Sequence, residues 1–330
     1  MLPRITLLAT GGTIASQQTD QGLMPLTTAK GILDFMPNLR ELADLTANDV
    51  FMLDSSNIQP EEWQLLARAV LEAAKQADGI IITHGTDTMA YTASALSFML
   101  QGIGIPVVFT GSQLPLMHPH SDAPGNLREA FAMALSGRAG VYIAFQHKVI
   151  HGTRAVKMRT LGFDAFDSIN LPPVGTFDAD GLHLVQEPPP LTPADLGADP
   201  LAIDARVFLL KMMPGTDPEI FDHILRAGYR GLVLEAFGLG GLHYIRRNLI
   251  DKLRKISEAG VITLVTTQCL YEKADFNIYE VGKGFQTPGI YGASDMTTEA
   301  AVTKLMWALG DLPKRQRLLT QCLVYEMCDR

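Results

Sequence analysis

Short apolar runs separated by longer stretches of helical character constrain the fold of this chain more than any other feature. Within each run the apolar residues follow one another without alternation, which is typical of strands buried on both faces of a parallel sheet. Helices between such strands provide the crossovers that parallel pairing requires. The sequence therefore predicts an α/β fold. In the first half of the chain the runs occupy residues 7–9, 50–53, 79–82, 106–110 and 141–145, and helices are expected at 60–75, 88–100 and 125–135.

The length of 330 residues exceeds what one small core holds, so two domains are expected. We assign residues 1–185 to a larger N-terminal domain with a parallel sheet in three layers, and residues 206–330 to a smaller C-terminal α/β domain. Between them, residues 186–205 contain three consecutive prolines and form a stiff linker. In the second domain strands are expected at 207–211, 231–235 and 261–266, and helices at 218–227, 244–259, 297–309 and 314–327.

Two segments depart from the alternation of strands and helices. Residues 16–28 form a polar stretch after the first strand, which predicts either an exposed surface loop or a lid. Residues 148–152 and 154–158 are short and alternate between apolar and polar side chains, which favours a hairpin. Lys157 would lie on the second arm of that hairpin.

Composition and charge argue against several classes of function. The net charge is −8 and the isoelectric point lies near 5.5, so the chain has no basic surplus for binding nucleic acid. No apolar run reaches the ~18 residues of a membrane-spanning helix, and no basic amphipathic stretch indicates a membrane surface. The N-terminal residues lack the pattern of a signal peptide, and the cysteines (Cys269, Cys322 and Cys328) suit a reducing compartment. A cytoplasmic protein is therefore expected.

Hydroxyl side chains gather where three of the predicted strands end. Because parallel strands end at the same edge of a sheet, where open α/β sheets bind ligands, these groups could share one pocket. Any one of them could instead cap the helix that follows. Their recurrence at several strand ends favours the pocket. The hydroxyls belong to Thr10, Thr13, Ser55, Ser56, Thr83, Thr86 and Thr88.

Glycines and charged residues accompany the hydroxyls. Gly11 and Gly12 permit a tight turn and a close approach of the backbone, so the Thr13 hydroxyl could stand beside free N–H groups. Asp87 could cap the following helix or receive a substrate ammonium. Lys157 is either a solvated charge or, if its strand crosses the sheet edge, a group that activates a hydroxyl or carries protons.

Other reactive patterns are weak or absent. His118 and His120 suggest a metal pair, but the proline between them distorts the spacing and no cysteine or acidic cluster completes a site. No metal is therefore expected. His84 is interpreted as a satisfied turn residue rather than a base. The sequence contains no nucleophile elbow, no phosphate-binding loop and no dinucleotide fingerprint.

The segments Ala9–Ala15 (Ala-Thr-Gly-Gly-Thr-Ile-Ala) and Thr83–Thr88 (Thr-His-Gly-Thr-Asp-Thr) closely resemble the two signatures of bacterial-type L-asparaginases, in the cytosolic (type I) branch. The resemblance implies an amidohydrolase that releases ammonia from the side chain of L-asparagine, with room for a weaker activity on glutamine. The likeness covers most of the chain and continues through residues 54–57, 108–113, 156–157 and 295–300.

The resemblance also implies roles for individual residues. By position, Thr13 corresponds to the nucleophile that forms an acyl-enzyme, and Thr86, Lys157 and Asp87 correspond to a second catalytic group. Neither a metal nor an organic cofactor is implied. The implied substrate-binding residues are Ser55 and Ser56 for the α-carboxylate, Asp87 for the α-ammonium, and Gly12 and Gly85 in the turns whose N–H groups would stabilise the oxyanion.

The family's active site lies between the N-terminal domain of one subunit and the C-terminal domain of a neighbour. The resemblance therefore implies a homodimer or a dimer of dimers. Its expected partner is the small-molecule substrate L-asparagine, with no role for nucleic acid or a membrane.

Three positions depart from the family's pattern. Leu23 occupies the place of a loop tyrosine that hydrogen-bonds the nucleophilic threonine, Gly241 replaces an asparagine near the substrate amine, and Glu235 stands where cytosolic relatives tend to have arginine. Losing one orienting hydroxyl can cost on the order of a hundredfold in rate. We expect either weak activity or a replacement hydroxyl from the second domain, with Tyr291 and Ser294 as candidates.

Two alternatives stay open. One is a related amidase whose substrate is not free asparagine, because Leu23 and Gly241 alter the rim of the pocket. The other is a non-catalytic amino-acid-binding protein that kept the carboxylate and ammonium sites. Retention of Lys157 argues against the second alternative, since binding alone would not require this lysine.

Overall fold

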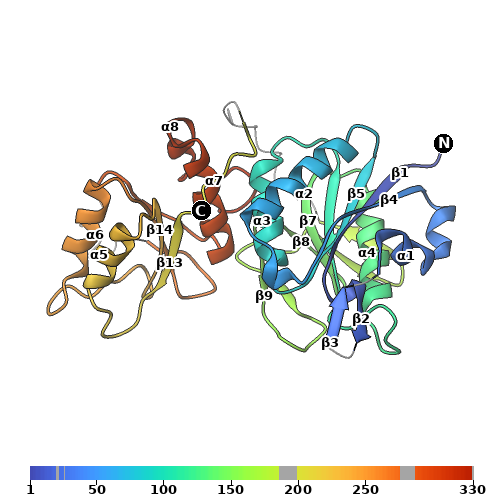
Figure 1. Cartoon of the computed structure of the whole chain (residues 1–330), viewed down its shortest axis with the longest axis horizontal. Helices are drawn as coiled ribbons and strands as arrows, with labels where there is room; N and C mark the ends of the chain where they lie inside the picture. Colours follow the sequence, from blue (N-terminus) through green and yellow to red (C-terminus); the bar gives the residue numbers. More distant parts are fainter. Residues whose placement is uncertain (20–21, 26, 186–198, 276–286, 329–330) are drawn as a thin grey trace. The chain divides into compact units, whose positions relative to one another are not determined.

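The chain forms two compact units, Met1–Pro193 and Ala194–Arg330, in a computed structural model that describes residues 1–19, 22–25, 27–185, 199–275 and 287–328 (Figure 1). Most of the expected linker, residues 186–198, lies outside the described residues. Each unit contains its own sheet of mainly parallel strands covered by helices, and this confirms the predicted fold class.

An eight-stranded sheet forms the centre of the first unit. Its strands are β1 (Arg4–Gly11), β4 (Asp44–Leu53), β5 (Gly79–Thr83), β6 (Pro106–Thr110), β7 (Gly140–Phe145), β8 (Lys148–His151), β11 (Gly175–Asp178) and β12 (Gly181–Leu184). Their spatial order is β12-β11-β8-β7-β6-β5-β1-β4, and the strands from β7 to β4 are parallel. β8, β11 and β12 extend the sheet by antiparallel pairing.

Helices cover both faces of this sheet (Figure 1). α1 (Ala29–Asp34) and α4 (Ala123–Leu135) share one apolar core with the strands. α2 (Pro60–Ala73) and α3 (Met89–Met99) pack together on the other side, where α3 is almost entirely buried because its side chains are small or apolar. Short 3₁₀ helices lie at Thr13–Ala15, Pro37–Glu41 and Ser55–Asn57.

The predicted hairpin of residues 148–158 is wrong in its pairing. β8 pairs with β7 and β11 in the main sheet, whereas β9 (Ala155–Lys157) pairs antiparallel with β10 (Phe166–Ser168). Val149 and Ile150 are both fully buried, so β8 needs cover on both of its faces, which the main sheet provides and a free hairpin would not. Lys157 does lie on an extended strand, as expected.

The polar stretch after β1 is regular rather than an irregular loop. β2 (Ser16–Thr19) and β3 (Gly22–Pro25) pair antiparallel, with Ser16 opposite Pro25. Backbone hydrogen bonds hold such a ribbon without an apolar face, so the sequence shows no alternation that would reveal it. The residues at its tip, 20–21, and the side chain of Leu23 lie outside the described part.

A four-stranded parallel sheet forms the second unit, in the order β13 (Val207–Lys211), β14 (Gly231–Ala236), β15 (Ile262–Thr267) and β16 (Ile290–Gly292). α5 (Glu219–Arg226) and α6 (Leu249–Glu258) pack on one face around an apolar core. α7 (Thr298–Gly310) packs on the opposite face, where a side chain at Gly231 would collide with Leu305 and Leu309.

Two predicted helices of this unit are wrong in extent. α6 begins at Leu249 rather than Tyr244, because the Asn248 side chain caps it by accepting the Asp251 N–H at 3.2 Å. In place of the helix expected over 314–327, α8 (Leu312–Arg315) and a 3₁₀ turn (Gln316–Leu318) are followed by irregular backbone. There the Glu326 carboxylate accepts N–H groups from the residues before it, which replaces helical hydrogen bonding.

Candidate active site

Four parallel strands, β4, β1, β5 and β6, end at one edge of the large sheet. The chain leaves β1 for β4 on one side and then crosses to β5 on the other, so β1 lies at a topological switch point. Missing side chains let the turns touch. A Cβ on Gly12 would lie 2.4 Å from the Gly85 Cα, and a Cβ on Gly85 would lie 2.6 Å from the Ser55 Oγ. Three strand ends are therefore held against one another at the edge where ligands bind in such sheets.

Lys157 connects the threonine and the carboxylate that follow β5. Its ammonium donates to Thr86 Oγ1 at 2.8 Å and to Asp87 Oδ1 at 2.6 Å. Thr86 is buried, the Lys157 side chain is 17% exposed and the Asp87 side chain is 62% exposed. The structure thus brings together residues about 70 positions apart, with the lysine shielded and the carboxylate open to solvent.

The hydroxyls beyond the strands do not act as simple helix caps. Thr88 occupies the N-cap position of α3 but makes no capping bond, and its Oγ1 donates instead to the Ser55 carbonyl at 2.7 Å. Thr10 Oγ1 donates to the Thr83 carbonyl at 2.9 Å. These bonds run between strand ends, so the expected alternative of independent caps does not hold for Thr10 and Thr88.

Ser55 and Ser56 lie in the 3₁₀ turn after β4 and differ in exposure. Ser55 is buried against Gly85, whereas Ser56 is exposed. The Asp54 carboxylate accepts the Ser56 N–H at 2.8 Å and fixes the start of the turn. Both hydroxyls therefore stand at the same edge as Thr86, one inside and one on its rim.

Thr13 begins the 3₁₀ turn that follows Gly12 and is half-buried. Within the described part of the chain, its hydroxyl has no hydrogen-bond partner, so it is chemically uncommitted. The Gly12 N–H, however, donates to the Leu53 carbonyl at 2.9 Å. The expectation that Gly12 offers a free N–H to a substrate oxyanion is wrong, and its contribution is the close contact with Gly85.

His84 is a buried structural residue in the turn after β5. Its Nδ1 lies 2.7 Å from the Gly85 carbonyl, and burial lowers the pKa of its imidazole to about 4. The ring is neutral near pH 7, which agrees with the interpretation of His84 as a turn residue rather than a base.

Sequence reasoning missed two residues that support this edge. Gln113, just beyond β6, accepts a hydrogen bond from Thr86 Oγ1 at 3.2 Å, and Asp122 holds the Gln113 backbone through its carboxylate. The signal was available, because Gln113 follows a strand that ends at the same edge. It carries no hydroxyl or charge, so its residue type gave no sign of reactivity.

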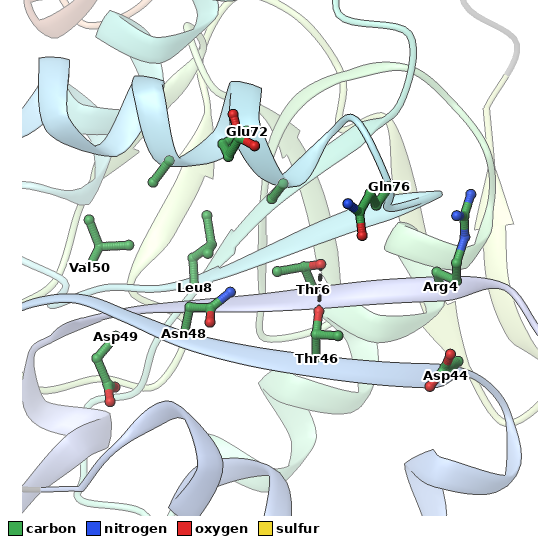
Figure 2. A pocket seen from close by; sticks show the side chains of 12 residues that line it. Arg4, Thr6, Leu8, Asp44, Thr46, Asn48, Asp49, Val50, Glu72 and Gln76 are labelled. Atoms are coloured by element: carbon green, nitrogen blue, oxygen red, sulfur yellow. Dashed lines mark hydrogen bonds between the residues drawn. The ribbon is translucent and has the colours of Figure 1, made fainter.

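Other candidate features show no reactive arrangement. His118 and His120 are exposed, and the His120 N–H bonds the neighbouring imidazole at 3.1 Å. Among the described residues no group of three or more potential metal ligands is present. A hollow of about 590 Å³ lies between α2 and strands β1 and β4 (Figure 2), but the Thr6 and Thr46 hydroxyls there bond each other at 2.8 Å.

The residues expected to complete the site from a neighbour belong to the second unit. The Tyr291 hydroxyl on β16 accepts a hydrogen bond from Gln316 Nε2 at 2.7 Å, and Ser294 has a left-handed backbone with φ of 52°. Gly241 forms an isolated antiparallel bridge with Phe237. The buried Glu235 carboxylate accepts a hydrogen bond from Thr298.

Family comparison agrees with this geometry. Residues 4–190 match the family model described as asparaginase, N-terminal, and residues 206–319 match the one described as glutaminase/asparaginase C-terminal domain. The chain belongs to the asparaginase family. Amidohydrolysis is therefore the class of chemistry to which this edge of the sheet is suited.

Individual relatives in the asparaginase family match nearly the whole chain. An L-asparaginase from Thermococcus kodakarensis is 42% identical, over 98% of this chain and 99% of its own. A glutamyl-tRNA(Gln) amidotransferase component from Methanosarcina barkeri is 38% identical, over 94% of this chain and 74% of its own. Among solved structures, the Thermococcus enzyme has a TM-score of 0.90 over 99% of this chain and 100% of its own. L-asparaginase I from Vibrio cholerae has a TM-score of 0.85 at 31% identity, with the same coverage.

Proposed function

We propose that this chain is an L-asparaginase, which hydrolyses L-asparagine to L-aspartate and ammonia. One observation carries the proposal: the Lys157 ammonium bridges Thr86 Oγ1 and Asp87 Oδ1 at 2.8 and 2.6 Å. The turn that carries Thr86 touches the turn that carries Thr13 through Gly12 and Gly85. A hydroxyl nucleophile and a lysine that can exchange protons through a second hydroxyl thus share one sheet edge.

Thr13 is the proposed nucleophile. Its Oγ1 attacks the side-chain amide carbon, the hydroxyl proton is passed to the site, and the amide nitrogen leaves as ammonia after taking up a proton. Water then hydrolyses the resulting ester, which restores the Thr13 hydroxyl and releases L-aspartate. The uncommitted state of this hydroxyl supports the role, because it need not break an existing bond before it attacks.

Thr86, Lys157 and Asp87 form the proposed proton-carrying group. Lys157 is shielded enough to stay ordered, and the exposed Asp87 carboxylate is accessible to a substrate ammonium. Ser55 and Ser56 are proposed to hold the α-carboxylate, and Gly85 to contribute at the turn. Every step in this scheme uses groups of the chain and water.

The assembly and the subfamily are further parts of the proposal. We place the chain in the cytosolic type I branch, as a cytoplasmic homodimer or dimer of dimers, with domains at 1–185 and 206–330. Support comes from L-asparaginase I of Vibrio cholerae and from a probable cytoplasmic L-asparaginase of Campylobacter jejuni, which is 26% identical. No described helix is long and apolar enough to span a bilayer. Tyr291 or Ser294 of a neighbour would supply the hydroxyl that Leu23 lacks.

A related amidase of other specificity is the second candidate, and one observation favours it. Several relatives that are 33 to 38% identical are components of glutamyl-tRNA(Gln) amidotransferases, which shows that this scaffold is compatible with other amide donors. The nearly complete two-way coverage by an L-asparaginase at 42% identity supports the first candidate more strongly.

Ammonia release tests the proposal directly. Purified protein is assayed with L-asparagine, L-glutamine and D-asparagine, beside Thr13→Ala and the matched control Thr176→Ala on an exposed site of β11. We expect turnover of L-asparagine by the wild type and Thr176→Ala, weaker turnover of L-glutamine, and at least a ~10⁴-fold loss in Thr13→Ala. Binding of L-asparagine without ammonia release would indicate a binding protein. Thr13-dependent release from another amide alone would indicate the related amidase.

A further inference from the structure

We propose that Gln113 is a positioning residue that fixes the direction of the Thr86 hydroxyl proton, an inference that rests on the proposed function of the same site. Gln113 Oε1 lies 3.2 Å from Thr86 Oγ1. Its Nε2 donates to two backbone carbonyls, those of Thr160 at 3.2 Å and Gly162 at 3.0 Å. One side chain thus touches both the catalytic threonine and the segment that follows Lys157.

The orientation of the amide follows from what each partner can do. Backbone carbonyls only accept, so the Gln113 NH₂ group must face Thr160 and Gly162, which leaves Oε1 for Thr86. A lysine ammonium only donates, so it cannot receive the Thr86 proton. The Thr86 hydroxyl must therefore point its proton at Gln113 and accept from Lys157.

This arrangement leaves Thr86 with one uncommitted lone pair. A hydroxyl oxygen has two lone pairs, and the Lys157 ammonium at 2.8 Å occupies one of them. The second can accept a hydrogen bond from the Thr13 hydroxyl or from the attacking water, which is the direction that proton removal requires. Without Gln113, the Thr86 proton could rotate toward that group and oppose it.

Gln113 is itself rigidly held. The Asp122 carboxylate accepts the Gln113 N–H at 3.1 and 3.0 Å and the Leu114 N–H at 3.1 Å. Asn126 Nδ2 donates to Asp122 at 3.1 Å and to the Gly111 carbonyl at 3.0 Å. The start of α4 therefore fixes the turn after β6, which is the support that a positioning side chain requires.

The first test is Gln113→Met, which keeps the volume and removes both hydrogen-bonding functions. We expect kcat for L-asparagine to fall about 30-fold with KM changed less than about threefold, because the loss concerns proton direction rather than substrate contact. The matched control is Gln101→Met, whose amide bonds only the Phe98 carbonyl at 3.1 Å and should leave kcat unchanged. A wild-type kcat in Gln113→Met would overturn the inference.

The second test is the pH profile of Gln113→Glu, which separates a positioning role from a purely structural one. The carboxylate can still accept from Thr86, but its charge lies close to Lys157 and favours the charged lysine. We expect the pH dependence of kcat to move about one pH unit to the alkaline side. A residue that only anchored the 158–165 segment would lower activity without moving the profile, and that result would count against the inference.

A structural readout keeps this inference separate from the proposed function. If the wild type releases no ammonia, the proposed function fails, and crystal structures of the wild type and Gln113→Met then decide the role of Gln113. We expect the Thr86 side chain to change rotamer or to occupy two rotamers in the variant. A Thr86 that keeps its rotamer would overturn the inference whatever the activity.

Discussion

Two lysine–carboxylate pairs in this chain have nearly equal geometry and very different surroundings. Lys157 donates to Asp87 at 2.6 Å, and Lys304 donates to Glu326 at 2.7 Å. The Lys304 and Glu326 side chains are completely buried, whereas the Asp87 side chain is 62% exposed. Distance alone therefore does not tell a catalytic pair from a structural one.

The difference lies in how completely the charges are satisfied. Lys304 also donates to the Gln321 carbonyl at 2.6 Å, and Glu326 accepts the N–H groups of Leu323 and Val324 at 3.0 and 2.7 Å. The buried pair is closed to water and binds the C-terminal segment to α7. The Lys157 pair is open on the Asp87 side, so it can meet a substrate. Exposure, rather than bond length, marks the reactive pair.

The largest expected effect comes from Lys157→Met. Removing a positioned proton carrier should lower kcat for L-asparagine by about 10²- to 10⁴-fold. The free energy of unfolding should change by less than about 1 kcal/mol, because its partner Asp87 is largely hydrated. Steady-state kinetics and urea denaturation measure the two quantities. A large loss of stability with retained kcat would break the comparison.

Lys304→Met should have the reverse profile. It leaves the Glu326 charge buried without its cation, and breaking such a pair costs about 3–5 kcal/mol of unfolding free energy. The folded fraction should keep a kcat close to that of the wild type. Urea denaturation and active-site titration of the soluble variant measure this, with Lys157→Met as the counterpart. Equal stability of the two variants would contradict the assignment of Lys304 as structural.

Acid should weaken the catalytic edge through His84. Burial lowers its folded pKa to about 4, while the unfolded value is near 6.5, so only the unfolded state takes up a proton between these values. Stability is therefore lost as the pH falls from about 6.5 to 4, by roughly 3 kcal/mol in total. Unfolding free energies of the wild type and His84→Asn at several pH values isolate the effect. An equal pH slope in both would show that His84 does not cause it.

The smallest effect is expected at a pair exposed on both sides. Lys75 bonds Glu72 on α2, where the side chains are 66% and 73% exposed. Lys75→Ala should change the unfolding free energy by less than about 0.5 kcal/mol and leave kcat unaltered. It serves as the surface reference for both buried and half-buried lysines. A cost comparable with that of Lys304→Met would show that burial is not the deciding variable.

The predictable part of the fold reflects local pattern. Unalternated apolar runs indicated β5, β6 and β14, and a proline followed by two glutamates indicated the start of α2. The C-terminal helix and the 148–158 hairpin were mispredicted, because Glu326 and β8 answer to partners that no local window contains. A side chain that bonds its own backbone can override helix propensity without any local sign.

By itself, the sequence determined which chemical groups arrive at the sheet edge, because strand ends follow directly from apolar periodicity and carry Thr13, Ser55 and Thr86 with them. Only the tertiary structure decided how those groups bond. Lys157 reaches Thr86 from a strand 71 residues away, and Gln113 reaches it from a third turn. Such contacts depend on crossover connections and on glycines that allow two turns to touch, and neither is encoded within one element.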